Sequence, residues 1–127
     1  MSTTQRTQSI SVNEDLREVH FTIGGEWDLA GMKAFLHEMN AKSAPLVESG
    51  GPIYGLGVMT DMVPANDEVY DYIRNHLMAS KEAGLCRVAI IDPPMLVKLS
   101  YKKLSEGLEV EYFYSKDKGL NWLRENR

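Results

Sequence analysis

The most constraining feature of the sequence is that short apolar segments alternate with amphipathic ones along most of its length. After two extended segments, "ISV" and "EVHFTIGG", helical patterns alternate with the strand-like "IYGLGVMT", "LCRVAII" and "LEVEYFYS". Strands that alternate with helices favour right-handed crossovers and a mainly parallel sheet. The order therefore predicts an α/β fold, ββαβαβαβα, in which helices flank the sheet and an antiparallel first strand lies at one edge.

Four helices are expected from apolar spacing and from the residues that precede them. Asp28 and Ser115 are suitable N-caps, a second helix spans about Asn66 to Ala83, and Pro93 and Pro94 suit the start of the third. The residues predicted to face inward are Leu29, Met32, Phe35, Leu36 and Met39 in the first helix, Val69, Tyr72, Ile73, His76 and Leu77 in the second, Met95, Leu96, Leu99 and Leu104 in the third, and Leu120 and Leu123 in the last.

Two segments are expected to lack regular structure. Residues 1–9 are polar and are predicted to form a disordered N-terminal tail, which leaves 10–127 as a single domain long enough for one sizeable core. The segment "AKSAPLVESGGP" reads as a loop because Pro45 and the Gly50-Gly51-Pro52 run interrupt both periodicities, with room only for a short helical turn around Leu46.

Charge and hydropathy exclude several classes of function. The net charge is -4, and the longest basic grouping is Lys102-Lys103, so nucleic acid is not an expected partner. No apolar run approaches the roughly 20 residues of a membrane-spanning helix, and the N-terminal segment has no hydrophobic signal core. We therefore expect a cytoplasmic protein without a membrane span.

The residue types that usually carry catalysis do not occur in recognisable patterns. Cys86 is the single cysteine, which excludes an intrachain disulfide and a thiolate zinc site, and its strand-like surroundings predict a buried thiol. The three histidines have no metal-binding spacing, and no glycine pattern completes a nucleotide-binding motif. The expectation is a protein without catalytic residues, cofactor or metal.

One cluster of acids follows the "IYGLGVMT" segment. Asp61, Asp67 and Glu68 stand where a parallel strand leads into a helix, and ligands of open α/β sheets bind at that edge. The simplest role of Asp67 and Glu68 is to stabilise the helix N-terminus, where the helix dipole favours negative charge by about 0.3–1 kcal/mol for each residue.

Four segments in order carry a resemblance to a known family. "FTIGGEWDLAGMKAF", "GVMTDM", "RVAII" and "VEYFYSKDKGLNWL" resemble the SpoIIAA-like, or STAS-like, family, which is related to bacterial anti-sigma-factor antagonists and to cytoplasmic modules of sulfate transporters. The match covers about residues 10–125, and Trp122-Leu123 after an aromatic strand is its strongest element. The resemblance implies a non-enzymatic regulatory domain that acts through a protein partner.

The regulatory serine of that family has no counterpart here. Anti-sigma-factor antagonists carry a phosphorylated serine in the loop after the central strand, whereas this loop reads "MVPANDEV" and no Ser or Thr occurs between Thr60 and Ser80. The phosphoswitch is therefore expected to be absent. A fixed mimic of phosphate by Asp67 or Glu68 is an alternative to capping, although a carboxylate carries less charge than a phosphate.

Two functions follow from these expectations. The first is binding of a protein partner, with a homodimer left open, at a surface over residues 61–72 that exposes Asp61, Met62, Asn66 and Asp67. The alternative is binding or carriage of an apolar small ligand such as a fatty acid or lipid, because the resemblance extends to lipid-carrying domains of the Sec14 type. Methionine side chains are flexible and can line an adaptable pocket, which fits this alternative, although they also fill ordinary cores. The methionines concerned are Met32, Met39, Met59, Met62, Met78 and Met95.

Overall fold

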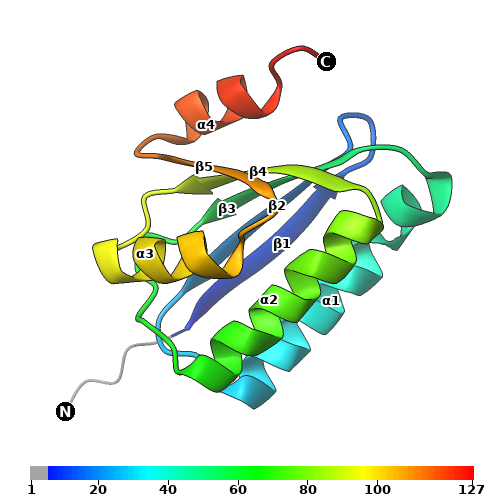
Figure 1. The fold of residues 1–127 in the computed structure, drawn as a ribbon. Helices are drawn as coiled ribbons and strands as arrows, with labels where there is room; N and C mark the ends of the chain where they lie inside the picture. The colour runs from blue at the N-terminus through cyan, green and yellow to red at the C-terminus, as the bar shows by residue number, and fades with distance from the viewer. Residues whose placement is uncertain (1–5) are drawn as a thin grey trace.

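The structure is a computed structural model that describes residues 6–127, with one five-stranded sheet and four helices (Figure 1). The elements in chain order are β1 (Thr7–Asn13), β2 (Glu18–Gly24), α1 (Leu29–Ser49), β3 (Ile53–Val58), α2 (Asp67–Glu82), β4 (Leu85–Ile91), α3 (Met95–Leu104), β5 (Glu109–Phe113) and α4 (Lys116–Leu123). This order confirms the predicted α/β fold class.

The strands lie in the sheet in the order in which they occur along the chain. β1 pairs with β2 in antiparallel register, with Ile10 opposite Phe21, and the pairs from β2 to β5 are all parallel. The predicted antiparallel strand at the edge is therefore confirmed. Because the strand order never reverses, successive right-handed crossovers place their helices on the same face of the sheet.

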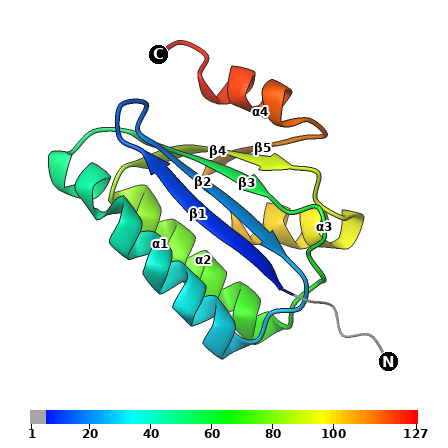
Figure 2. The same ribbon diagram turned by 180° about the vertical axis from the view of Figure 1, so that it is seen from behind.

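The helices form two unequal layers. α1, α2 and α3 cover one face of the sheet, and α4 crosses the opposite face over β3, β4 and β5 (Figures 1 and 2). The larger layer encloses the main apolar core, and α4 buries a smaller cluster of Leu56, Ala89, Ile91 and Leu123. Trp122 packs beside that cluster with its ring centroid 5.7 Å from that of Phe113.

The two predicted caps and most of the predicted inward residues are confirmed. The side chains of Asp28 and Ser115 accept hydrogen bonds at the starts of α1 and α4, and Asn66, which was expected only as the approximate start of its helix, caps α2 in the same way. The inward residues that the structure buries include Met32, Phe35, Leu36 and Met39 in α1, Val69, Ile73 and Leu77 in α2, Leu104 in α3 and Leu123 in α4.

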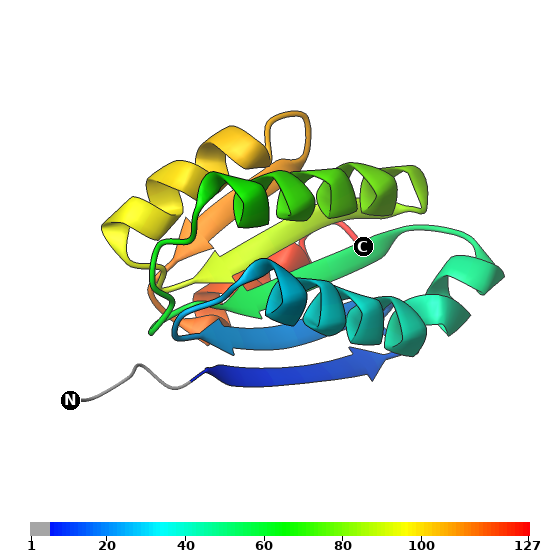
Figure 3. The same cartoon turned by 90° about the horizontal axis from the view of Figure 1, so that it is seen from below.

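The segment predicted as a loop after residue 41 is instead the last part of α1. The helix continues through Pro45 to Ser49, and its final turns bend away from the rest (Figure 3). A proline inside a helix removes one hydrogen bond and costs about 3 kcal/mol. Leu46, only 1% exposed, anchors this end of the helix in the core, and burial of that side chain offsets part of the cost.

The apolar side of α3 also differs from the prediction. Its core-facing residues are Val97, Tyr101 and Leu104, whereas Met95, Leu96 and Leu99 are 67%, 64% and 49% exposed. Both sets have helical spacing, so periodicity alone did not distinguish them. Leu104 is the one predicted inward residue of this helix that the core contains.

Two further expectations fail at the edges of the fold. β1 begins at Thr7, so residues 7–9 pair with β2 instead of belonging to the tail, and the rest of that predicted tail, up to residue 5, lies outside the described residues. Cys86 is exposed, because it lies near the start of β4, where the pairing with β3 shifts register beside Ile53. That residues 10–127 form a single domain stays a prediction.

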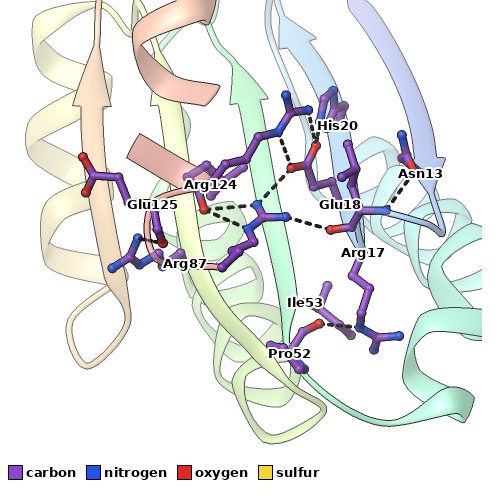
Figure 4. A network of polar contacts seen from close by, with 12 residues as sticks. Asn13, Arg17, Glu18, His20, Pro52, Ile53, Arg87, Arg124 and Glu125 are labelled. Carbon is purple, nitrogen blue, oxygen red and sulfur yellow. Dashed lines mark hydrogen bonds and ion pairs between the residues drawn. The ribbon is translucent and has the colours of Figure 1, made fainter. Parts of the chain in front are cut away.

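A buried carboxylate joins the C-terminal segment to β2 (Figure 4). Glu18 is fully buried and accepts hydrogen bonds from Arg124 Nε at 2.8 Å and from Arg127 Nη2 at 2.9 Å, and its Oε1 lies 2.9 Å from His20 Nε2. Burial alone would raise the pKa of Glu18, but the hydrogen bonds from Arg124 and His20 outweigh it and lower the pKa from 4.5 to about 2. The ion cluster holds the residues after α4 against the sheet.

This cluster predicts a loss of stability in acid. A carboxyl group whose pKa is depressed in the folded state contributes stability above its unfolded pKa and loses it as the pH falls through the folded value. We expect the free energy of unfolding to drop by on the order of 1–2 kcal/mol between pH 4.5 and 2, less than the full shift in pKa would give because Arg124 is partly exposed to solvent.

The matched variant is Glu18→Gln, measured by urea denaturation across the same pH range. It should be less stable than the wild type at pH 7 and should lack the part of the acid-dependent fall that Glu18 contributes. An identical pH profile for both proteins would show that the Glu18 cluster does not stabilise the fold.

Candidate functional site

The loop between β3 and α2 is held against the end of β2. Gly25 donates its N–H to the Asp61 carbonyl at 2.8 Å, and Val63 donates to the Gly25 carbonyl at 3.1 Å. Asn66 then caps α2, because its Oδ1 accepts the Val69 N–H at 3.0 Å. Asp67 follows in the first turn of the helix. The backbone of this segment is therefore well fixed.

The predicted interaction residues do not all face solvent. Asp61, Asn66 and Asp67 are exposed, whereas Met62 is only 4% exposed and points into the core. The expectation that Met62 is exposed is wrong. Its N–H donates to the Met59 carbonyl at 3.1 Å, and it forms an isolated bridge with Gly25, so the turn directs the side chain inward.

The carboxyl edge of the sheet lacks the strand-order reversal that usually forms a ligand crevice. In open α/β sheets a ligand crevice forms where the strand order reverses and neighbouring helices pass to opposite faces. Here the strands of residues 6–127 follow one another in chain order, and α1, α2 and α3 share one face (Figure 1).

A cavity of about 320 Å³ lies between the sheet and the pair α1 and α2. Its floor is formed by core-facing residues of β2, β3 and β4, and its roof by the facing sides of the two helices. The apolar lining residues that form its walls include Val19, Phe21, Ile23, Met32, Phe35, Leu36, Met39, Ile53, Met59, Met62, Ile73, Leu77, Val88 and Val97.

A glycine in β3 and four methionines contribute to the cavity. Gly55 lies in its floor, and a Cβ at that position would meet the Val88 side chain at 3.5 Å, an ordinary contact, so the missing side chain leaves space rather than avoiding a clash. Met32, Met39, Met59 and Met62 line the cavity. Of the six methionines singled out in the sequence, these four meet there. Unbranched thioether side chains adapt to occupants of different shape.

The polar lining residues gather along the seam between α1 and α2. α1 contributes Asn40 and Ser43, and α2 contributes His76 and Ser80, whose Nε2 and Oγ atoms lie 3.5 Å apart. Asn40 is exposed and the other three are half-buried, so the cavity reaches the surface at this seam. Burial lowers the pKa of His76, which favours the neutral imidazole.

This seam lies away from the predicted interaction residues. α1 and α2 run side by side in the same direction over the sheet (Figure 3), and Val47 and Ala83 line the cavity near their C-terminal ends. The loop carrying Asp61 precedes the N-terminus of α2. Met59, Met62 and Tyr70 connect the two regions, because they line the cavity from the loop side and the Tyr70 hydroxyl accepts the Ala65 N–H at 3.1 Å.

The sequence-based search for chemistry missed Asn40, Ser43 and Ser80 and treated His76 as a core residue. A signal existed, since Asn40, Ser43 and Val47 recur at helical spacing in one helix, as His76, Ser80 and Ala83 do in the other. The pairing of these two faces was not visible without the structure.

Within residues 6–127, no group of three His, Cys, Asp or Glu side chains is placed to hold a metal ion.

No helix within the described part of the chain is both long and apolar enough to cross a membrane.

Comparison with known proteins gives a match at the level of structure. No protein-family sequence profile matches the chain, and no curated protein is similar to it in sequence. An uncharacterized protein of the DUF3478 family from Shewanella loihica PV-4, whose crystal structure has a SpoIIAA-like fold, superposes with a TM-score of 0.72. The match covers 97% of this chain and 98% of that one at 20% sequence identity.

The chain has a SpoIIAA-like fold. The resemblance expected from the sequence is thereby confirmed for the fold. At this level of identity the likeness shows the architecture alone, because one fold can host unrelated functions.

Proposed function

We propose that the protein binds an apolar small molecule in the cavity between the sheet and the helices α1 and α2, and that it binds this molecule without catalysing a reaction. The observation that carries the proposal is the cavity of about 320 Å³ with its apolar walls. Small-molecule sites are typically concave, largely apolar, and about 300–1,000 Å³ in volume, with a few convergent polar groups.

The energetic cost of an empty cavity favours an occupant. Unfilled core volume costs about 24 cal/mol per Å³, so a cavity of this size, if fully enclosed and empty, forgoes about 8 kcal/mol of packing. Domains are stable by only about 5–15 kcal/mol in total. Opening at the seam reduces the cost without removing it. An apolar ligand would restore the missing contacts.

A neutral fluorescent probe, N-phenyl-1-naphthylamine, tests the proposal directly. We expect saturable binding by the wild type with one site per chain, and displacement of the probe by single-chain lipids. The variant Val88→Phe should fold and lose most probe binding, because the phenyl ring extends from the sheet into the cavity.

The matched control is Val69→Phe, which enlarges a fully buried valine that does not line the cavity. Overpacking there should lower the free energy of unfolding by about 1–3 kcal/mol, whereas Val88→Phe should cost less because it fills existing space. Absence of saturable probe binding by the wild type, or equal binding by Val88→Phe, would contradict the proposal.

The surface over residues 61–72 remains a second candidate, for a protein partner. It is supported by the exposure of Asp61, Asn66 and Asp67 on a well-fixed loop beside the N-terminus of α2. Met62 no longer belongs to the proposed surface, because its side chain is buried.

Charge reversal tests this second candidate. Asp67→Lys should weaken capture of a cross-linked partner while costing about 1–2 kcal/mol of stability through the helix dipole. Glu82→Lys, at the opposite end of α2, is the control and should capture the partner as the wild type does. Equal capture by all three proteins would leave Asp67 as a helix-stabilising residue only.

A further inference from the structure

Apart from the phenol groups of Tyr70 and Tyr101, the polar side chains that line the cavity lie at its opening, which gives the site a polar mouth and a largely apolar interior. Asn40, Ser43, His76 and Ser80 lie at the seam between α1 and α2, and the depth of the cavity is bounded by buried residues such as Ile23, Met59 and Met62. A wholly apolar molecule would leave the seam groups without a ligand partner. The arrangement suits an amphiphile whose polar end stays at the seam.

The dimensions favour a single chain. The lining residues of this segment run from Tyr70 in α2 to Ala83 just after the helix, which corresponds to about 20 Å along the helix axis at 1.5 Å per residue. A volume of about 320 Å³ spread over that length is narrow. One extended alkyl chain fits such a space better than a lipid with two chains.

The charges at the seam argue against an anionic head group. Around the cavity, the lining residues that the structure describes include no Asp, Glu, Lys or Arg. Lys33, a cation on the same side of α1, lies two turns before Asn40, and its Nζ is 5.6 Å from the centroid of the Tyr72 ring. Burial lowers the pKa of His76, so its imidazole supplies no permanent positive charge.

The hydrogen-bonding groups at the seam also favour an uncharged head group over an anionic one. The Ser43 hydroxyl donates to the Met39 carbonyl at 2.8 Å, which leaves the Ser43 oxygen as an acceptor. Asn40 offers both a donor and an acceptor, and a neutral His76 has one ring nitrogen, Nε2, facing the Ser80 hydroxyl at 3.5 Å and a second nitrogen for a ligand. A carboxylate only accepts hydrogen bonds and would meet the Ser43 lone pairs, whereas a hydroxyl both donates and accepts.

We infer that the occupant is a single-chain amphiphile with an uncharged, oxygen-bearing head group, such as an alcohol, bound with its chain in the cavity and its head at Asn40, Ser43 and His76. The inference rests on the proposed binding of an apolar molecule and specifies its chemical class. It separates neutral amphiphiles from fatty-acid anions of the same chain length.

The experiment compares decan-1-ol with decanoate at pH 8, where the acid is ionised, by displacement of N-phenyl-1-naphthylamine. We expect decan-1-ol to bind the wild type at least about tenfold more tightly, because the anion would lose its hydration at a site without a cation. Equal affinities, or tighter binding of decanoate, would overturn the inference.

Two histidine variants then locate the selectivity. His76→Phe should reduce the ratio of the two affinities by about fivefold, because the phenyl ring offers no hydrogen bond to the alcohol. His37→Phe, on the exposed side of α1 and outside the cavity, should keep the wild-type ratio. An unchanged ratio in His76→Phe would overturn the assignment of the head-group site.

The outcomes distinguish this inference from the proposed function on which it rests. If the protein binds the probe but shows no preference for decan-1-ol, the proposed apolar site stands and only the inference of an uncharged head group is contradicted. Failure of the wild type to bind the probe, decan-1-ol and decanoate removes both.

Discussion

The apolar layer between the sheet and the helices α1 and α2 is the contact on which the rest of the structure depends. It supplies most of the main core, with Met32, Phe35 and Leu36 from α1 and Val69 and Ile73 from α2 among its buried residues. Protein interiors are normally packed as densely as organic crystals. A cavity within this layer therefore leaves the main contact of the fold less densely packed than usual. In this account the same layer both stabilises the fold and binds the ligand.

Contacts on the opposite face of the sheet help the fold to tolerate this cavity. There Arg124, beside Glu18 in Figure 4, and Arg127 hold the C-terminal residues to β2, which is far away in the sequence. Stability contributed on that face does not depend on the filling of the cavity. The arrangement lets one layer of helices remain adaptable while the sheet beneath it stays fixed, and an occupant that binds only the folded state would add further stability.

The sequence was sufficient for the fold because each element carried a local signal. Caps such as Asp28 and Ser115, and buried strands such as the one before Asp92, are determined by neighbouring residues. Prediction failed where tertiary contacts decide between local alternatives. Pro45 is accepted inside α1 because Leu46 is buried, and α3 turns Val97 rather than Leu96 toward the core. The candidate site also depends on tertiary contacts, because its polar groups come together only where the Ser43 face of α1 meets the His76 face of α2.

The most direct test of the central claim is a mass spectrum of the intact protein under non-denaturing conditions, after purification without detergent. The account predicts a population heavier than the chain by the mass of one single-chain lipid, together with loss of that population when the protein is denatured. Incubation with decan-1-ol should produce the same one-to-one adduct in the wild type and not in Val88→Phe. A wild-type protein that shows only the mass of the bare chain, even with excess decan-1-ol, would contradict the claim that the cavity is a binding site.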